Sequence, residues 1–265
     1  ERVTNILKVL VKLWSFKGEP RPPLDRDLSV RMARAIAEQG SVLLKNEGEA
    51  LPLIRKGPIG VLGENAVAPY STGGGSAGVA SPYKVSLLEG LQARFGDDQV
   101  HYGVIPPGAV AAIVSAGINS SEGADRPNMD LPGADLTLIH DTAARCKELG
   151  IPCIVVLNVC GPVEMASWID QVDAVLLIWL AGMELGHAAA ALIAGDENPS
   201  GKLVCTWPRR YKDVPSALNF PGESGGLVKR ADELQGTEKE TVTFGYGYSA
   251  TAFQLIAAVN TVANG

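Results

Sequence analysis

The residues best suited to chemistry form one short polar stretch, Ser120-Ser121-Glu122-Gly123-Ala124-Asp125-Arg126. The stretch follows an apolar run, residues 110–118, that predicts a buried strand, and it precedes a Leu-Pro-Gly break that opens a helix. In open α/β sheets, ligands bind outside the carboxyl ends of the strands. Because Gly123 permits a sharp turn, we expect Glu122 to point outward into a cleft. The alternative is a surface loop that carries ordinary charges.

Two further charged residues are candidates for a role, namely Arg126 in this loop and Glu184 farther along the chain. We expect Arg126 to stiffen the loop through a bidentate pair with Asp125 or another carboxylate. A second carboxylate, Glu184, stands at the start of a predicted helix, where the helix dipole favours an acidic side chain. Helix capping is therefore the preferred interpretation of Glu184, and His187 is expected to be packed or solvated rather than a ligand. The sequence has no Ser-His-Asp or Cys-His arrangement that would support triad chemistry.

A glycine-rich segment, Gly73-Gly74-Gly75-Ser76-Ala77-Gly78, looks at first like a phosphate cradle. It lacks the Lys-Ser/Thr pair of a P-loop and the G-x-G-x-x-G register that follows a strand in dinucleotide-binding proteins. Close approach of the backbone to a neighbouring loop or to a sugar is the better interpretation. A nucleotide-binding, flavodoxin-like protein stays open as an alternative.

The composition narrows the possible partners. The chain has 265 residues, of which 46% are hydrophobic, so a sizeable core can form. Its net charge of −6 and the lack of a basic stripe argue against nucleic acid, and no apolar run reaches the roughly 18 residues that span a bilayer. The four cysteines lack zinc-site spacing, and those at 153 and 160 are expected to be small buried residues. We expect no metal, cofactor, nucleic acid or membrane partner.

Helical and apolar segments alternate along the chain and predict an α/β fold. It should be a three-layer sandwich with a mostly parallel central sheet and helices on both faces. We expect helices over residues 27–39, 86–95, 134–149 and 184–194, and strands over residues 41–45, 58–62, 100–103, 110–118, 153–159, 174–179 and 203–206. Residues 226–241 are charged and predict a loop.

Two places do not fit this pattern simply. Residues 103–110 are too few for an ordinary parallel crossover, so either a neighbouring strand is misread or a segment has been lost there. At the front, residues 3–13 predict an amphipathic helix, which a stiff Pro-rich linker separates from the rest. Its apolar stripe must be buried against something, and that partner can lie outside the chain.

Taken together, the segments resemble the C-terminal α/β-sandwich domain of glycoside hydrolase family 3, the family of many β-glucosidases. The resemblance covers about residues 33–253 and rests on the order and spacing of the motifs rather than on any one of them. The motifs are SVLLKN (41–46) with LPL (51–53), GGGSA (73–77) with LEGL (88–91), EGADR (122–126) with LP (131–132), GMELG (182–186), NPSGKL (198–203), and FGYG (244–247) with Ser249.

The resemblance implies a retaining, double-displacement mechanism. The nucleophile of the family is an aspartate on an N-terminal (β/α)8 barrel, and the general acid/base comes from the loop that Glu122 occupies here. That role implies a raised pKa and a carboxyl about 5–5.5 Å from the nucleophile. Asp125 and Arg126 would hold the loop in shape. Ala124 stands where relatives usually have an aromatic residue, which weakens a stacking platform for the sugar.

The resemblance also implies a division of the chain. Residues 1–24 would be the last helix of a preceding barrel with a Pro-rich linker, and residues 25–265 the C-terminal domain. We expect a part of a β-glucosidase-like enzyme that acts on a β-linked glucoside or oligosaccharide and needs the barrel as its partner. The isolated chain should be inactive, and the resemblance favours a secreted or periplasmic location. The alternative is a degenerate, non-catalytic carbohydrate-binding or scaffold domain.

Overall fold

A computed structural model describes residues 2–211, without residues 14, 19, 21, 22, 125 and 210. The predictions for residues 226–241 and 244–249 lie outside this part. The described residues form a six-stranded sheet in the order β1-β6-β5-β4-β2-β3, in which only the β1–β6 pair is antiparallel. The strands are β1 (Val42–Asn46), β2 (Ile59–Leu62), β3 (Val100–Tyr102), β4 (Ala111–Ile118), β5 (Cys153–Val159) and β6 (Ala174–Leu177). The predicted mostly parallel sheet is thus confirmed.

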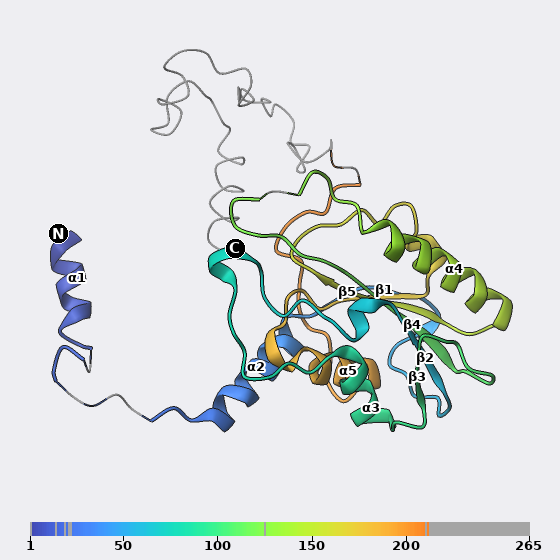
Figure 1. Cartoon of the computed structure of the whole chain (residues 1–265), viewed down its shortest axis with the longest axis horizontal. Helices are drawn as coiled ribbons and strands as arrows, with labels where there is room; N and C mark the ends of the chain where they lie inside the picture. The colour runs from blue at the N-terminus through green and yellow to red at the C-terminus, as the bar shows by residue number, and fades with distance from the viewer. Residues whose placement is uncertain are drawn as a thin grey trace, which may run out of the picture.

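Helices cover both faces of this sheet, as predicted. Helices α3 (Leu87–Phe95) and α5 (Leu185–Ala194) share one core with alternate strand residues such as Ile113, and α2 (Arg26–Gly40) packs on α5. Helix α4 (Gly133–Leu149) shares the other core with the intervening residues, such as Val114. Successive side chains of a strand point to opposite faces, so one strand serves both cores. Figure 1 shows α4 on one side of the sheet and α3 and α5 on the other.

The connection of residues 103–110 joins two strands that both exist, so neither was misread. Strands β3 and β4 lie on either side of β2 and run parallel to it. The connection passes directly over β2 at Gly60, where an added Cβ would lie 2.8 Å from the Val104 carbonyl oxygen. Beyond this crossing, Ile105 packs against the core under α4. A direct crossing over a glycine therefore joins the two strands without a crossover helix.

Residues 203–206 do not form the predicted strand. The place beside β6 is taken by β1, which pairs antiparallel with it from Val42 opposite Leu177. The later segment bonds to the start of β1 through Gly201, whose N–H donates to the Ser41 carbonyl oxygen over 3.1 Å. Leu203 and Val204 are exposed as a result. Apolar residues alone could not reveal that the sheet position was already occupied.

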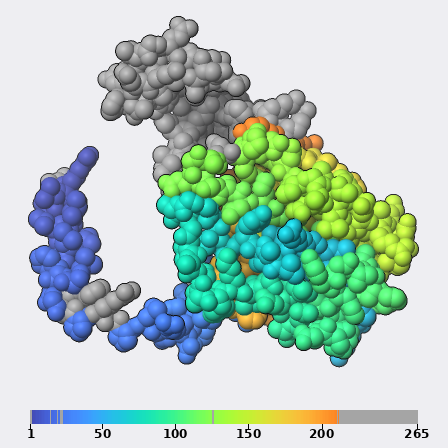
Figure 2. Space-filling view, in the orientation of Figure 1, coloured from blue at the N-terminus to red at the C-terminus, as the bar shows by residue number. Residues whose placement is uncertain are grey.

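Helix α1 (Arg2–Leu10) stands apart from the α/β body (Figures 1 and 2). It has no buried residue, and its apolar side chains, Val3, Ile6 and Leu7 among them, are exposed. In the described part of the chain, none of the helices combines the length and the apolar character needed to cross a bilayer.

Candidate functional site

Glu122 lies at the carboxyl edge of the sheet, just beyond the end of β4. The glycine-rich segment lies beside it and forms a short parallel bridge between Gly74 and Ser121. The Gly74 N–H donates to the Ser120 carbonyl oxygen over 2.9 Å, and the Glu122 N–H donates to the Gly74 carbonyl oxygen over 3.4 Å. The glycine-rich segment, far away in sequence, thus holds the backbone of the Glu122 loop.

A tight turn follows Glu122, as the sequence predicts. Gly123 has a φ of +74°, and the Ala124 N–H donates to the Ser121 carbonyl oxygen over 3.1 Å. A positive φ is accessible to glycine at little cost. Both Glu122 and Ala124 are exposed. The turn therefore presents a carboxylate and a small side chain at the surface of this edge.

The glycines at 74 and 75 allow the two loops to touch. An added Cβ at Gly75 would lie 2.7 Å from the Glu122 Cβ, and one at Gly74 would lie 2.8 Å from the Ser121 Cβ. Real Cβ atoms do not approach other carbons so closely. The prediction of close backbone approach to a neighbouring loop is confirmed, and the loop concerned is the one that carries the candidate carboxylate.

Ser76 sets the ionisation of Glu122. The Ser76 backbone N–H donates to Oε2 of Glu122 over 3.0 Å. Hydrogen bonds from the Ser76 side chain and backbone lower the pKa of Glu122, because they favour the charged carboxylate. This direction is opposite to the raised pKa that a general acid needs. The carboxylate is also turned toward the glycine-rich segment rather than standing free.

Arg126 ties the Glu122 loop to the loop that follows β5. Its Nη2 donates to the Pro162 carbonyl oxygen over 2.8 Å and lies against Gly161. Its Nη1 is buried without a hydrogen-bond partner among the described residues. Within the described part, Arg126 thus bonds to a carbonyl and not to the carboxylate that the sequence predicts as its partner. Asp125, the other predicted partner, lies outside the described residues.

A buried polar network centred on Asn158 was missed by the sequence reasoning. The Asn158 side chain donates to the carbonyl oxygens of Tyr70 and Trp179 over 2.9 and 2.6 Å, and it accepts from the Tyr70 N–H over 2.7 Å. It also accepts from Asn65, which in turn accepts from the Ser115 hydroxyl. The network fixes the chain that leads into the glycine-rich segment. A lone asparagine within the apolar run CIVVLNV was the available signal, since buried polar groups need partners.

Glu184 proves to be a structural carboxylate, although it does not cap α5 with its side chain. It is buried, accepts from the Tyr83 hydroxyl over 2.6 Å and pairs with His187 Nδ1 over 2.8 Å. Burial opposes its ionisation, but the bonds from Tyr83 and His187 outweigh burial and lower the pKa of Glu184. The capping prediction was wrong because the carboxylate turns back toward the loop before α3. His187 is thus a hydrogen-bond partner of this carboxylate.

The same edge offers little to a metal ion. Within the part of the chain that the structure describes, no three His, Cys, Asp or Glu side chains group closely enough to hold one. Among the described residues, Glu122 is the exposed carboxylate that a tight turn and a neighbouring loop hold in place.

Comparison with known proteins relates the chain to glycoside hydrolases. Residues 41–250 match the glycosyl hydrolase family 3 C-terminal domain. The chain is 35% identical to thermostable beta-glucosidase B of Acetivibrio thermocellus over 95% of its own length and 37% of that protein. It is 30% identical to an exo-alpha-(1->6)-L-arabinopyranosidase of Bifidobacterium longum, over 91% of its length and 36% of that protein.

A solved structure gives the same result. Beta-glucosidase 3B of Thermotoga neapolitana, in complex with alpha-D-glucose, superposes with a TM-score of 0.71 at 32% identity. The match covers 83% of this chain and 36% of that one. The chain thus spans less than two fifths of the length of these relatives.

Proposed function

The chain belongs to glycosyl hydrolase family 3 as a C-terminal domain, and from this premise we propose that Glu122 is the general acid/base of a retaining, β-glucosidase-like enzyme. In the first step Glu122 would protonate the glycosidic oxygen as the sugar passes to an aspartate nucleophile. In the second step it would take a proton from the water that releases the sugar. The substrate would be a β-linked glucoside or oligosaccharide, and the nucleophile would lie on a preceding barrel.

One observation carries this assignment: two backbone segments grip the loop of Glu122 yet leave its side chain exposed at the carboxyl edge. General acid/base catalysis needs a carboxyl that is fixed in place and still reachable by substrate. The bridge between Gly74 and Ser121 supplies the fixing, and the bond from Arg126 to Pro162 holds the far end of the loop. Asp125 is proposed to support the loop together with Arg126. Ala124 leaves room beside Glu122 but offers no aromatic surface for a sugar.

The low pKa of Glu122 defines what the barrel must contribute. In the described chain Glu122 is exposed and its pKa is lowered by Ser76, so at neutral pH it is a carboxylate. Removing water from a carboxyl raises its pKa, because the charged form loses hydration. A barrel and a sugar that cover Glu122 would supply this desolvation. We therefore expect Glu122 to become an acid only in the assembled, substrate-bound enzyme.

The proposed barrel would cover apolar surface that the described chain leaves bare. Residues 1–24 would be the final barrel helix and a linker, and residues 25–265 the C-terminal domain. The apolar stripe of α1 has no partner among the described residues, and α2 exposes Leu28, Met32 and Ile36 at successive helical turns. Surfaces of this kind mark sites of protein contact. Without the nucleophile, the isolated chain should not hydrolyse a glucoside.

A fusion experiment tests the assignment. The chain is joined behind the barrel of the Thermotoga neapolitana enzyme, and aryl β-glucosides of rising leaving-group pKa are assayed. In Glu122→Ala, kcat/KM for poor leaving groups should fall by about 10²–10⁴, because these need a proton, while activated aryl glucosides lose far less. Glu64→Gln is the matched control, since Glu64 is an exposed carboxylate just beyond β2 on the same edge. Equal losses for all leaving groups would refute the role.

A non-catalytic carbohydrate-binding domain is the second candidate. The lowered pKa of Glu122 favours it, because a general acid needs a raised pKa. Calorimetric titration of the isolated chain with glucose and cellobiose separates the two readings. The enzyme proposal expects no measurable heat, because most of the sugar pocket would lie on the barrel. Saturable binding by the isolated chain, together with an inactive fusion, would favour the second candidate.

A further inference from the structure

A second hollow lies at the amino edge of the sheet, at the other end of the parallel strands from Glu122. It is an open cavity of about 850 Å³ between the turn after β1, the end of α4 and the segments that lead into β5 and β6. None of its lining residues belongs to the Glu122 loop or to the glycine-rich segment. What binds here is therefore independent of the role proposed for Glu122.

The turn after β1, which forms one wall of the cavity, is held rigidly. The Asn46 side chain donates to the Leu51 carbonyl oxygen over 2.8 Å and accepts from the Leu51 N–H over 2.9 Å. The Glu47 N–H donates to the Asp173 carbonyl oxygen over 2.7 Å, which ties the turn to the residue before β6. The cavity is thus formed before a ligand arrives, as is usual for small-molecule sites.

Much of the cavity wall is apolar and aliphatic. The apolar residues come from the turn after β1, from α4 and from the segments before β4 and β5, and they include Pro52, Leu53, Val110, Ala143, Ile151 and Pro152. Among the described residues, no aromatic side chain lines the cavity. Nucleobases are commonly held by stacking on aromatic side chains. The wall therefore suits a ligand with an aliphatic body.

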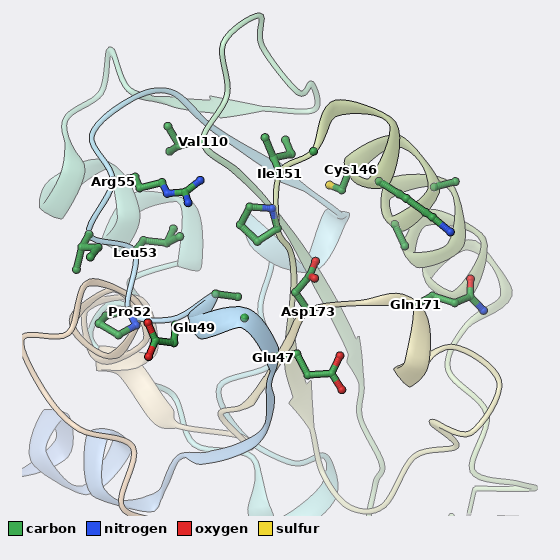
Figure 3. A pocket seen from close by; sticks show the side chains of 18 of the residues that line it. Glu47, Glu49, Pro52, Leu53, Arg55, Val110, Cys146, Ile151, Gln171 and Asp173 are labelled. Atoms are coloured by element: carbon green, nitrogen blue, oxygen red, sulfur yellow. The ribbon is translucent and has the colours of Figure 1, made fainter.

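Charged groups of both signs face the cavity. Figure 3 shows Arg55 and Asp173 extending into it from two sides. In the part of the chain that the structure describes, Arg55 takes part in no ion pair. The Cys153 N–H donates to Oδ2 of Asp173 over 2.7 Å, which fixes this carboxylate and leaves Oδ1 open to a ligand. Glu49 adds a further carboxylate to the wall.

The other charges of the wall leave a small excess of carboxylates. Glu47, Asp170 and Lys147 also line the cavity, and Glu47 already pairs with Lys45 over 3.2 Å. A phosphate or another polyanion would be repelled by these acids. The described residues also bring no three acidic, His or Cys side chains close enough to hold a metal ion. The charges therefore favour an organic ligand that carries both an anionic and a cationic group.

We propose that this cavity binds a zwitterion with an aliphatic body, either an apolar α-amino acid or a short apolar peptide. The planar fork of Arg55 would donate two bonds to the carboxylate of the ligand, and Oδ1 of Asp173 would accept from its ammonium group. The aliphatic body would lie against residues such as Leu53 and Ile151. A volume of about 850 Å³ is typical of pockets for drug-sized molecules, so it has room for more than one amino acid.

Ligand-observed NMR on the full chain tests the proposal. The probes are leucine and dileucine, with N-acetyl-dileucine and dileucine amide as matched probes that each lack one charge. Dileucine should bind saturably, and each matched probe should bind about threefold more weakly because it loses one ion pair. Tighter binding of dileucine than of leucine identifies a peptide as the ligand, and the reverse or equality identifies a single amino acid. A lack of saturable binding, or equal binding of all dileucine probes, would overturn the proposal.

Substitutions test whether the probe lies in this cavity. Arg55→Gln should weaken dileucine by about threefold but leave dileucine amide unchanged, because the amide has no carboxylate to lose. Asp173→Asn should weaken the amide, and its side chain keeps an acceptor for the Cys153 N–H. Lys56→Gln and Asp141→Asn are the matched controls, since both residues are exposed and neither lines the cavity.

Binding that Arg55→Gln leaves unchanged would place the probe elsewhere and contradict the proposal. The same holds if Lys56→Gln weakens dileucine as much as Arg55→Gln does, because the effect would then be one of net charge. Should Asp173→Asn fail to fold, Arg55→Gln still decides, since Arg55 is exposed and has no ion-pair partner among the described residues.

Discussion

Glu122 and Glu184 both lie in segments that follow parallel strands of the sheet, but their surroundings suit them to different roles. Glu184 is buried and saturated by side chains, with Tyr83 on one oxygen and His187 on the other. Glu122 is exposed, and it is held mainly through the backbone of its loop and by Ser76. A carboxylate whose oxygens are both occupied by the protein has little left for a substrate. The comparison separates a structural acid from an available one.

The largest effect is expected from the network that underlies the available carboxylate. Asn158→Leu should destabilise the chain by about 3 kcal/mol or more, because it removes the bonds to the backbone of Tyr70 and Trp179 and to the buried side chain of Asn65. Urea unfolding measures this loss. Asn119→Ala is the matched control, since Asn119 also donates to a backbone carbonyl in this region but is not in the network. Equal effects would show that the network is not what positions the glycine-rich segment.

Removal of the structural acid should come next. Glu184→Ala should cost about 1–3 kcal/mol, because Tyr83 and His187 lose a buried charged partner. Glu122→Ala should leave the free energy of unfolding almost unchanged, as is usual for exposed positions. Thermal or urea unfolding of both variants checks the contrast. If Glu122→Ala destabilised the chain as much as Glu184→Ala, the distinction between the two carboxylates would be lost.

The contact between the two loops predicts a smaller effect. Gly75→Ala places a Cβ 2.7 Å from that of Glu122 at a φ of +71°. Gly103→Ala has a similar φ of +78° but open space around the new Cβ. The control should cost about 1–2 kcal/mol for the left-handed backbone alone. Gly75→Ala should cost measurably more, and in the fusion it should also lower activity. Equal stability losses would mean that the loops do not press on each other.

The pH dependence of stability gives the smallest predicted effect. The folded pKa of Glu122 lies below the unfolded value of about 4.3, so its contribution is present above that pH and is lost as the pH falls through the folded pKa. Glu122→Gln lacks this contribution. The stability difference between the unsubstituted chain and Glu122→Gln should therefore shrink on acidification. Urea midpoints at neutral and acid pH measure it, and a difference that grew instead would reverse the assigned shift.

The sequence predicts best the features that depend on neighbouring residues. The apolar runs of β4 and β5 indicate buried strands, and Gly123 indicates the turn beside Glu122. The glycine-rich segment predicts close backbone approach, although the sequence alone leaves open whether it approaches a loop or a sugar. Each of these signals reflects a local steric or burial requirement, which the residue types record directly.

Contacts between residues far apart in the sequence could not be predicted from these local signals. Tyr83 meets Glu184, and Ser76 meets Glu122, only because the sheet order brings their loops together. Residues 203–206 have the composition of a strand, but β1 already occupies the place beside β6. Neither hydrophobic periodicity nor strand propensity shows which of two apolar segments pairs with a given strand. The bond from Ser76 that lowers the pKa of Glu122 in the described chain is a pairing of this kind, and the sequence does not predict it.

Azide rescue in the fusion protein tests the central claim most directly. Azide is an anion that attacks the sugar without help from a general base, so it can replace the second task of Glu122. In Glu122→Ala, azide should speed turnover of an activated aryl glucoside and yield β-glucosyl azide. In the control Glu64→Gln, azide should not change the rate. If Glu122→Ala shows neither acceleration nor this product, Glu122 is not the acid/base of this enzyme.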